Sequence, residues 1–227
     1  MKNLSNENII HVKKGETEYI QFRKLLEYGD IINHAYGIGI NKNYRTTKSN
    51  GSEVYNKAIK DYEDLCTAIG INYKDIIKPC QEHTNNIKEV IKKNNSDKVN
   101  FQQEEYKSTD GLITNKENIA LATTNADCIL LLLFDPIKKV IGNVHSGWRG
   151  TLQRISVQAV EKMKKDYNCN PADIICCICP SIRKCHFEVH ADVQELYSKE
   201  FKKLNKIEEL ITVVPNENKW KIDTVEI

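Results

Sequence analysis

Cys128 and His145 stand at the two ends of a segment that can fold back on itself. Two apolar runs meet at Asp135-Pro136, a pair typical of a turn, so the segment is predicted to form a β-hairpin. Because this turn lies midway between them, Cys128 and His145 are expected to face each other directly, with Cβ atoms about 5 Å apart. A thiolate and an imidazole at that separation could share a metal ion or a proton.

His83 is the histidine best placed to join this pair, because it directly follows a predicted strand. Two histidines and a thiolate can hold zinc tetrahedrally with one position open, which is the arrangement of a catalytic zinc site. A cysteine nucleophile with a histidine base and no metal is the competing chemistry for the same residues. A lone histidine in a loop is more often structural or solvated, and spacing alone does not choose between these roles.

The elements around the pair are predicted to be a buried hairpin and a following helix. Both faces of the hairpin are apolar, which indicates a sheet that is covered on both sides. After Ser146 an apolar period near 3.6 predicts a helix over residues 150–167. A helix N-terminus beside the pair, with the guanidinium of Arg149, would suit an anion or a developing negative charge.

Elsewhere the pattern predicts a strand at residues 31–36, a polar loop at 41–51 and an amphipathic helix at 53–69. Residues 174–179 are expected to form a buried strand in which cysteine acts as a small hydrophobe. A further helix is expected at residues 189–201. Helices and hairpins are therefore mixed, and the predicted fold is a mixed α/β (α+β) single domain, layered α/β/β/α with mixed sheets.

Composition limits the classes of protein to which the chain can belong. Its 227 residues are 40% hydrophobic, and 33 basic against 31 acidic residues give a net charge of +2, with no sign of a nucleic-acid or membrane surface. The longest apolar run, Ile129 to Phe134, is far shorter than the roughly 20 residues of a membrane span. The N-terminus lacks the apolar core of a signal peptide, so a cytoplasmic protein with reduced thiols is expected.

A specific resemblance is carried by the segments Gln81-Glu82-His83, Asp110-Gly111-Leu112-Ile113-Thr114, Asn125-Ala126-Asp127-Cys128, Asp135-Pro136, His145-Ser146-Gly147-Trp148-Arg149-Gly150, Pro180-Ser181-Ile182 and Cys185-His186-Phe187-Glu188-Val189. They resemble one known family, the bacterial polyphenol oxidase or laccase-domain family. Its members are described as purine nucleoside phosphorylases, and it includes the peptidoglycan editing factors. The resemblance extends from about residue 31 to about residue 223.

This resemblance implies that His83, Cys128 and His145 bind zinc, with copper as a second metal that the site could accept. It implies phosphorolysis of adenosine, inosine and methylthioadenosine to a free base and ribose 1-phosphate, with adenosine deamination as a companion activity. The expected partners are therefore purine nucleosides and phosphate. A true laccase is not expected, because the chain has six histidines and none of them forms a His-x-His pair.

Roles for the neighbouring residues follow from the same motifs. Cys128, His145 and Asp127 are the expected catalytic residues, and Asp127 either transfers a proton or orients a ligand histidine. Gly147 and Arg149, at the start of the helix, are expected to bind the phosphate. Asp110 is expected to cap a turn rather than take part in the chemistry.

The chain also departs from the family pattern. Residues 34–40 lack the early arginine, Thr84 and Cys179 replace glycines, and residues 1–227 are expected to be one domain without the family's C-terminal segment. Alternative functions are an amide hydrolase that edits a peptidoglycan precursor with Cys128 and His145, an inactive metal-binding paralogue, or a non-enzymatic binding protein.

Overall fold

A computed structural model of the chain describes residues 3–46, 51–93, 101 and 103–227. Its strands are β1 (Ile9–Lys14), β2 (Thr17–Phe22), β3 (Tyr36–Ile38), β4 (Ile76–Ile77), β5 (Ile87–Glu89), β6 (Gly111–Thr114), β7 (Ala120–Leu121), β8 (Ile129–Asp135), β9 (Val140–Ser146), β10 (Ile175–Ile178), β11 (Glu188–Val189), β12 (Ile211–Val213) and β13 (Trp220–Ile222). Its helices are α1 (Arg23–Leu26), α2 (Ser52–Ala68), α3 (Trp148–Leu152), α4 (Ile155–Tyr167), α5 (Ala191–Glu200) and α6 (Ile207–Leu210).

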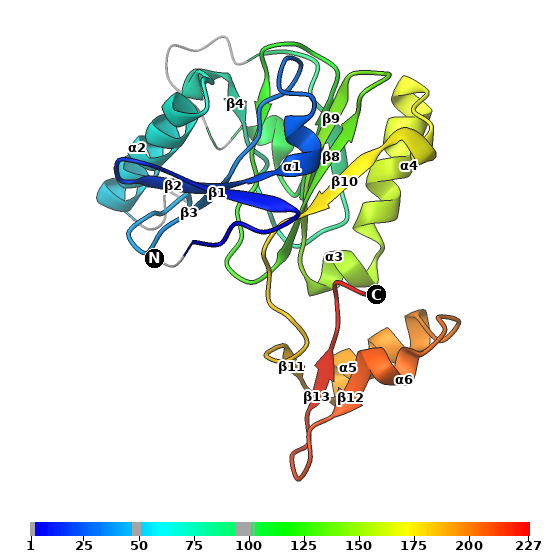
Figure 1. Cartoon of the computed structure of the whole chain (residues 1–227). Helices are drawn as coiled ribbons and strands as arrows, with labels where there is room; N and C mark the ends of the chain where they lie inside the picture. Colours follow the sequence, from blue (N-terminus) through cyan, green and yellow to red (C-terminus); the bar gives the residue numbers. More distant parts are fainter. Residues whose placement is uncertain (1–2, 47–50, 94–100, 102) are drawn as a thin grey trace.

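The centre of the molecule is a five-stranded sheet in the order β10-β8-β9-β6-β5 (Figure 1). Its strands are antiparallel except for the parallel pair β5 and β6, so the sheet is mixed. Helix α4 covers one face, and the β1-β2-β3 sheet with α1 covers the other, while α2 packs against β2. The predicted mixed α/β fold with several sheets and a hairpin covered on both faces is confirmed.

The hairpin β8-β9 forms as predicted, but its register differs by two residues. Leu130, not Cys128, lies opposite His145, and the paired strands end at Asp135 and Val140. The turn is longer than the predicted two-residue turn, because the Asp135 carboxylate accepts the N–H groups of Ile137 and Lys138 at 2.9 and 2.8 Å. Since side chains alternate with period two, the two-residue error leaves Cys128 and His145 on the same face of the sheet.

The helix predicted over residues 150–167 is divided in two. α3 ends at Leu152 and α4 begins at Ile155, because Arg154 adopts a left-handed conformation with φ of 58°. The strand predicted at 31–36 is wrong: the chain turns there, and β3 begins only at Tyr36. The helix predicted at 53–69 is confirmed by α2, whereas residues 47–50 of the predicted polar loop lie outside the described residues.

The cysteine-bearing strand β10 is an edge strand, which corrects the prediction that it is buried throughout. Cys177 and Cys179 pack into the core beside Phe22 and Leu130, as small hydrophobes. The alternate side chains, those of Cys176 and Ile178, are exposed, and β10 has a hydrogen-bonded neighbour on one side only.

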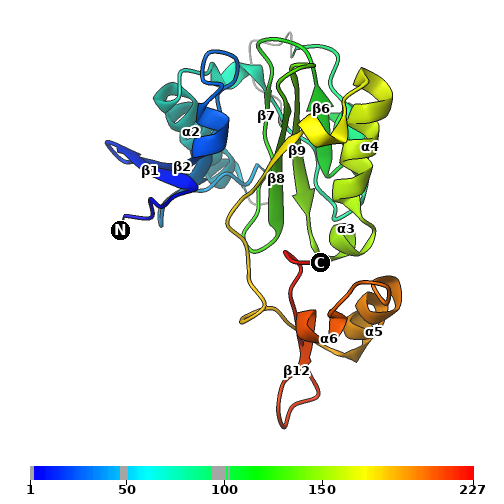
Figure 2. The same ribbon diagram turned by 45° about the vertical axis from the view of Figure 1, so that its right-hand side comes forward.

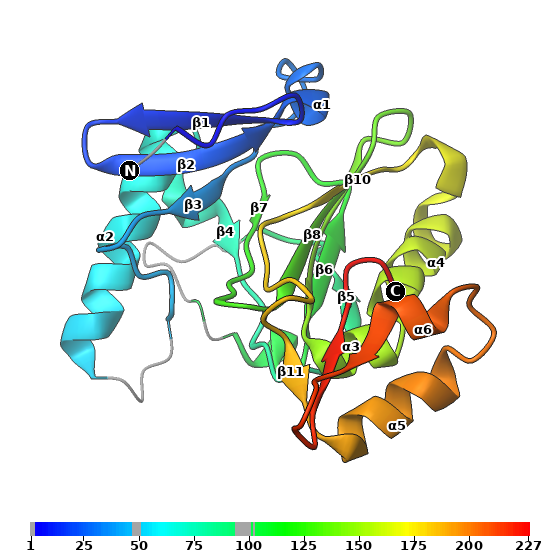
Figure 3. The ribbon, with the colours of Figure 1, turned by 60° about the horizontal axis from the view of Figure 1, so that its bottom comes forward.

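Residues 188–227 form a small unit beside the main sheet, built from β11, β12, β13, α5 and α6 (Figures 2 and 3). α5 confirms the helix predicted at 189–201. The unit packs against α3 through Trp148 and Leu152, and the Tyr197 hydroxyl donates to the carbonyl of Trp148 at 2.7 Å. Within the described part of the chain, no helix has the length and hydropathy needed to cross a membrane.

Candidate metal centre

Three elements bring His83, Cys128 and His145 together. His83 lies in the loop between β4 and β5, Cys128 directly precedes β8, and His145 is on β9. Their ligand atoms all lie within 4.8 Å of one another. The Cys128 Sγ is 3.9 Å from the His83 Nε2, and the two imidazole rings meet nearly at right angles, with centroids 5.0 Å apart. The predicted trio therefore converges in the structure.

Asp110 contacts both histidines of the cluster through hydrogen bonds. Its fully buried carboxylate is 2.8 Å from the Nδ1 of His145. The same carboxylate accepts the backbone N–H groups of Glu82, His83 and Thr84 at 3.2, 3.1 and 2.7 Å, and the Thr84 hydroxyl at 2.8 Å. Because Nδ1 of His145 is engaged, its Nε2 is the nitrogen available to a metal. Asp110 thus caps the loop, as predicted, and also orients His145.

The charges of this pair follow from their contacts. Burial alone would raise the pKa of Asp110, but hydrogen bonds from His145, Thr84 and Glu82 outweigh it and lower that pKa below its usual value. Burial alone would lower the pKa of His145, whereas its hydrogen bonds to Asp110 and Cys128 raise that pKa to about 9. In the metal-free protein the imidazolium and the carboxylate therefore stabilise each other.

Two glycines allow the start of α3 to approach the ligands. A Cβ added to Gly147 would lie 2.5 Å from the Cδ2 of His83 and 3.4 Å from the Cys128 Sγ. A Cβ on Gly150 would come within 3.3 Å of the Thr84 carbonyl oxygen. The role of Gly147 that follows from this geometry is to leave room for the ligands.

The donor set fits a zinc ion. Zinc in proteins accepts imidazole nitrogen and thiolate sulfur, and tetrahedral ligands around it lie about 3.5 Å apart. The 3.9 Å between the Cys128 Sγ and the His83 Nε2 is close to this separation. Three protein ligands leave a fourth position for water or substrate, as in catalytic rather than structural zinc sites.

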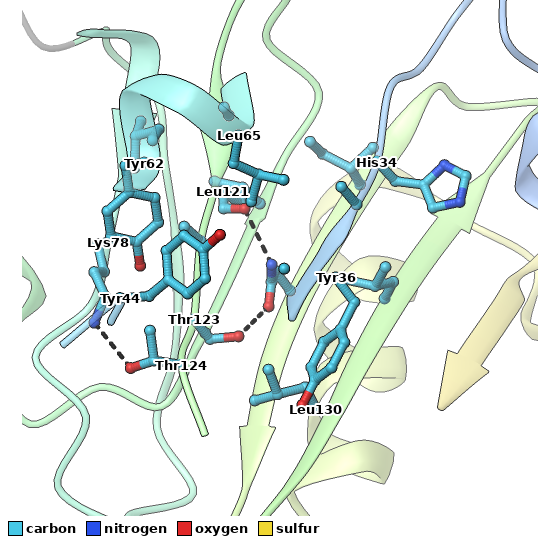
Figure 4. Close-up of a pocket in the computed structure, with 18 of the residues that line it drawn as sticks. His34, Tyr36, Tyr44, Tyr62, Leu65, Lys78, Leu121, Thr123, Thr124 and Leu130 are labelled. Atoms are coloured by element: carbon cyan, nitrogen blue, oxygen red, sulfur yellow. Dashed lines mark hydrogen bonds between the residues drawn. The ribbon is translucent and has the colours of Figure 1, made fainter. Parts of the chain in front are cut away.

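A cavity of about 1630 Å³ reaches this cluster, and all three ligands line it. Tyr36 and Asn125 form part of its wall: the Tyr36 hydroxyl donates to the Asn125 Oδ1 at 3.1 Å. Figure 4 shows a part of the cavity with His34 and Tyr36 on one side and Tyr44, Tyr62 and Lys78 on the other. A polar small molecule could therefore reach the cluster.

The remaining predicted residues lie around the cluster. Asp127 lines the cavity with an exposed side chain, and its carbonyl accepts the N–H of Ile182 at 2.8 Å. Arg149 is exposed, its guanidinium carbon lies 4.1 Å from the centroid of the Trp148 ring, and it is not among the described residues that line the cavity. The contact between Asp110 and His145 was not predicted, although Asp110 precedes β6, which pairs with β9.

Known proteins are similar to this chain in sequence and in fold. Residues 48–227 match the family model described as multi-copper polyphenol oxidoreductase laccase. The chain is 29% identical over 147 residues to purine nucleoside phosphorylase YlmD of Bacillus subtilis (strain 168), covering 63% of this chain and 53% of that protein. It is 28% identical over 143 residues to adenosine deaminase RL5 of an unknown prokaryotic organism, covering 63% and 54%.

Among solved structures, the hypothetical protein YfiH of Bacillus licheniformis superposes with a TM-score of 0.68 at 20% identity, covering 99% of this chain and 80% of that one. This likeness confirms the fold. The chain spans about half the length of the two curated relatives that it matches. Because the family model covers most of the chain, including every ligand of the cluster, the protein belongs to the multi-copper polyphenol oxidoreductase laccase family, which is also the laccase-domain family of the purine nucleoside phosphorylases.

Proposed function

We propose that the protein is a zinc-dependent purine nucleoside phosphorylase. It cleaves adenosine, inosine and methylthioadenosine with phosphate to a free base and the corresponding ribose 1-phosphate, and it deaminates adenosine as a side activity. The relatives named as purine nucleoside phosphorylase and adenosine deaminase support this reaction class.

The observation that carries the proposal is the cluster of His83, Cys128 and His145 on the wall of a large cavity. A structural zinc site is closed by four protein ligands, whereas this one offers three beside a space that can admit a substrate. When bound, zinc would act as a Lewis acid and lower the pKa of a bound water towards 7. Imidazole and thiolate also suit copper, so copper is the second metal to test.

The residues around the cluster take separate roles in this proposal. Cys128 and His145 hold the metal at the reaction centre, and Asp110 keeps the Nε2 of His145 directed at it. Asp127, an exposed carboxylate on the cavity wall beside Cys128, is proposed to transfer a proton to or from the substrate. The binding of phosphate by Gly147 and Arg149 stays a prediction.

We also propose that residues 1–227 act as one phosphorylase domain in the cytoplasm. All eight cysteines are free thiols in the structure, which supports a reducing compartment.

The direct test is turnover of adenosine. Zinc-loaded protein is incubated with adenosine, with and without phosphate, and adenine and inosine are separated by chromatography. Adenine that requires phosphate supports the phosphorylase, and inosine formed without phosphate supports the deaminase. Cys128→Ala should abolish both products and the bound zinc, whereas Cys176→Ala, at an exposed cysteine on the edge strand, should abolish neither.

Two outcomes would contradict the proposal. Protein that binds one zinc per chain but forms no product would be an inactive metal-binding paralogue. Turnover of an aminoacylated sugar nucleotide that survives chelation would instead indicate the amide hydrolase.

A further inference from the structure

Lys78 is a buried amine in the cavity wall that the proposed function does not use. It follows β4, is only 6% exposed and lines the cavity. Lysine is almost never this buried without a charged partner. Among the described residues no carboxylate forms an ion pair with it, and the hydrogen bond found for its Nζ goes to the Thr124 hydroxyl at 3.2 Å.

The wall around Lys78 is rigidly built. The backbone N–H of Thr124 donates to the Gln81 Oε1 at 2.8 Å, and the Gln81 amide donates back to the Thr124 carbonyl at 2.7 Å. These two bonds join the segment before His83 to the segment before Cys128. Lys78 and Thr124 therefore belong to two joined segments that lead to His83 and Cys128.

Unpaired hydroxyls line the same part of the cavity. The Tyr44 and Tyr62 hydroxyls are buried and have no hydrogen-bond partner in the described part of the chain, and their rings lie 5.1 Å apart. In Figure 4 the Tyr62 hydroxyl and the Lys78 amine are on the same side of the pocket. Buried polar groups are normally paired. These donors therefore need an acceptor, and the described residues do not supply one.

The chemistry of the missing acceptor follows from these donors. An ammonium and a phenolic hydroxyl, without a neighbouring carboxylate, suit an oxyanion. Burial lowers the pKa of Lys78 to about 8, with a partly opposing effect of Cys80, so at pH 7 the amine is mainly charged and uncompensated. A bound anion would supply the missing charge.

We propose that Lys78, supported by Thr124 and the Tyr62 hydroxyl, binds a phosphate group in the same cavity as the metal cluster. Thr124 and Cys128 are four residues apart, so their Cα atoms are at most about 14 Å apart. A nucleoside with a phosphate is of this order of length and could contact both sites. The phosphate is either free inorganic phosphate or the phosphoryl group of a nucleotide. That it is the co-substrate rests on the proposed function, and in that case Lys78 is an alternative to the phosphate site predicted at Gly147 and Arg149.

Binding and stability test this subsite without requiring turnover. Thermal unfolding is followed for the wild type and for Lys78→Met, each with inorganic phosphate, AMP or adenosine. Lys78→Met should fold and have a higher melting temperature without ligand, because an uncompensated buried charge is removed. Phosphate affinity, measured by calorimetry, should fall at least tenfold in Lys78→Met. It should stay within twofold in Lys107→Met, an exposed lysine of the cavity wall that pairs with Glu104.

The arms of the experiment separate the outcomes. Binding of phosphate that depends on Lys78 identifies the free anion, and binding of AMP alone that depends on Lys78 identifies a nucleotide. Equal phosphate affinity in the wild type and Lys78→Met, or no binding of either phosphate compound, would overturn the subsite. The same titrations on Cys128→Ala, which cannot turn over, should show phosphate binding unchanged. If that result appears while wild-type protein forms no product, the phosphorylase proposal fails and the subsite stands.

Discussion

Replacing Asp110 with asparagine should weaken metal binding although Asp110 is not itself a ligand. Its Oδ1 accepts from His145 and from the backbone N–H of His83, whereas its Oδ2 accepts from the loop donors of Glu82 and Thr84. An asparagine of the same shape has one oxygen and one NH₂ group, so it can accept on one side only. With its oxygen towards the loop, its NH₂ group would face the Nδ1 of His145 and favour the tautomer whose proton occupies Nε2, the nitrogen that the metal needs.

The expected size of the effect follows from these contacts. Loss of a group that orients a metal-bound histidine typically lowers metal affinity by about 10- to 100-fold, or about 1.4–2.7 kcal/mol. One or two buried donors left without an acceptor cost about 1–3 kcal/mol each. We therefore expect Asp110→Asn to destabilise the metal-free protein by about 2–4 kcal/mol.

Metal affinity is measured by competition with a chromophoric chelator, and the free energy of unfolding by urea titration of the metal-free protein. Asp135→Asn is the matched control, because Asp135 is also a fully buried carboxylate that accepts two backbone N–H groups, at the other end of the hairpin. It should keep its metal affinity, because both N–H groups bond to the Oδ1, which asparagine retains, and neither belongs to the metal cluster. Wild-type zinc affinity in folded Asp110→Asn would refute the role given to Asp110.

Three further predictions concern single residues. Gly147→Ala should lower zinc affinity at least tenfold, because its Cβ would lie 2.5 Å from the His83 ring, whereas Gly29→Ala, at 3.4 Å from its nearest neighbour, should not; the chelator competition checks both. Burial lowers the pKa of His34 from 6.5 to about 4, so its neutral form is stabilised in the fold. Stability should therefore be complete above pH 6.5 and fall by roughly 3 kcal/mol as pH drops towards 4, and urea unfolding of His34→Gln should lack this loss. Because a protonated His145 cannot bind metal and its pKa is raised to about 9, apparent zinc affinity should rise about tenfold per pH unit between 7 and 9, with proton release detectable by calorimetry in different buffers.

The hairpin and its ligands could be predicted because their information is local. Two apolar runs define the strands β8 and β9, and the turn residues between them place Cys128 and His145 on one face. The turn itself was placed one residue too early, because the side chain of Asp135 extends it through hydrogen bonds that a dipeptide pattern does not reveal. A shift of two residues in register preserves the face, which is why Cys128 and His145 still converge with His83.

Residues whose roles depend on distant contacts were harder to predict. The break between α3 and α4 occurs at Arg154, which in isolation favours a helix; its side chain instead pairs with Glu200 and stacks on Phe201. The exposed face of β10 could not be read from residues 174–179, because an apolar run does not say whether a strand lies at an edge.

Lys78 and Asp110 illustrate the same limit for polar residues. Each is a common charged residue in the sequence, and only its burial distinguishes it from the many solvated lysines and aspartates. Burial has opposite consequences for the two, because Asp110 is surrounded by donors that offset its charge, whereas no described acidic group pairs with Lys78. A satisfied buried charge organises the protein around it, and an unsatisfied one points to a ligand of opposite charge. On this reasoning Asp110 belongs to the architecture of the metal centre and Lys78 to the recognition of its substrate.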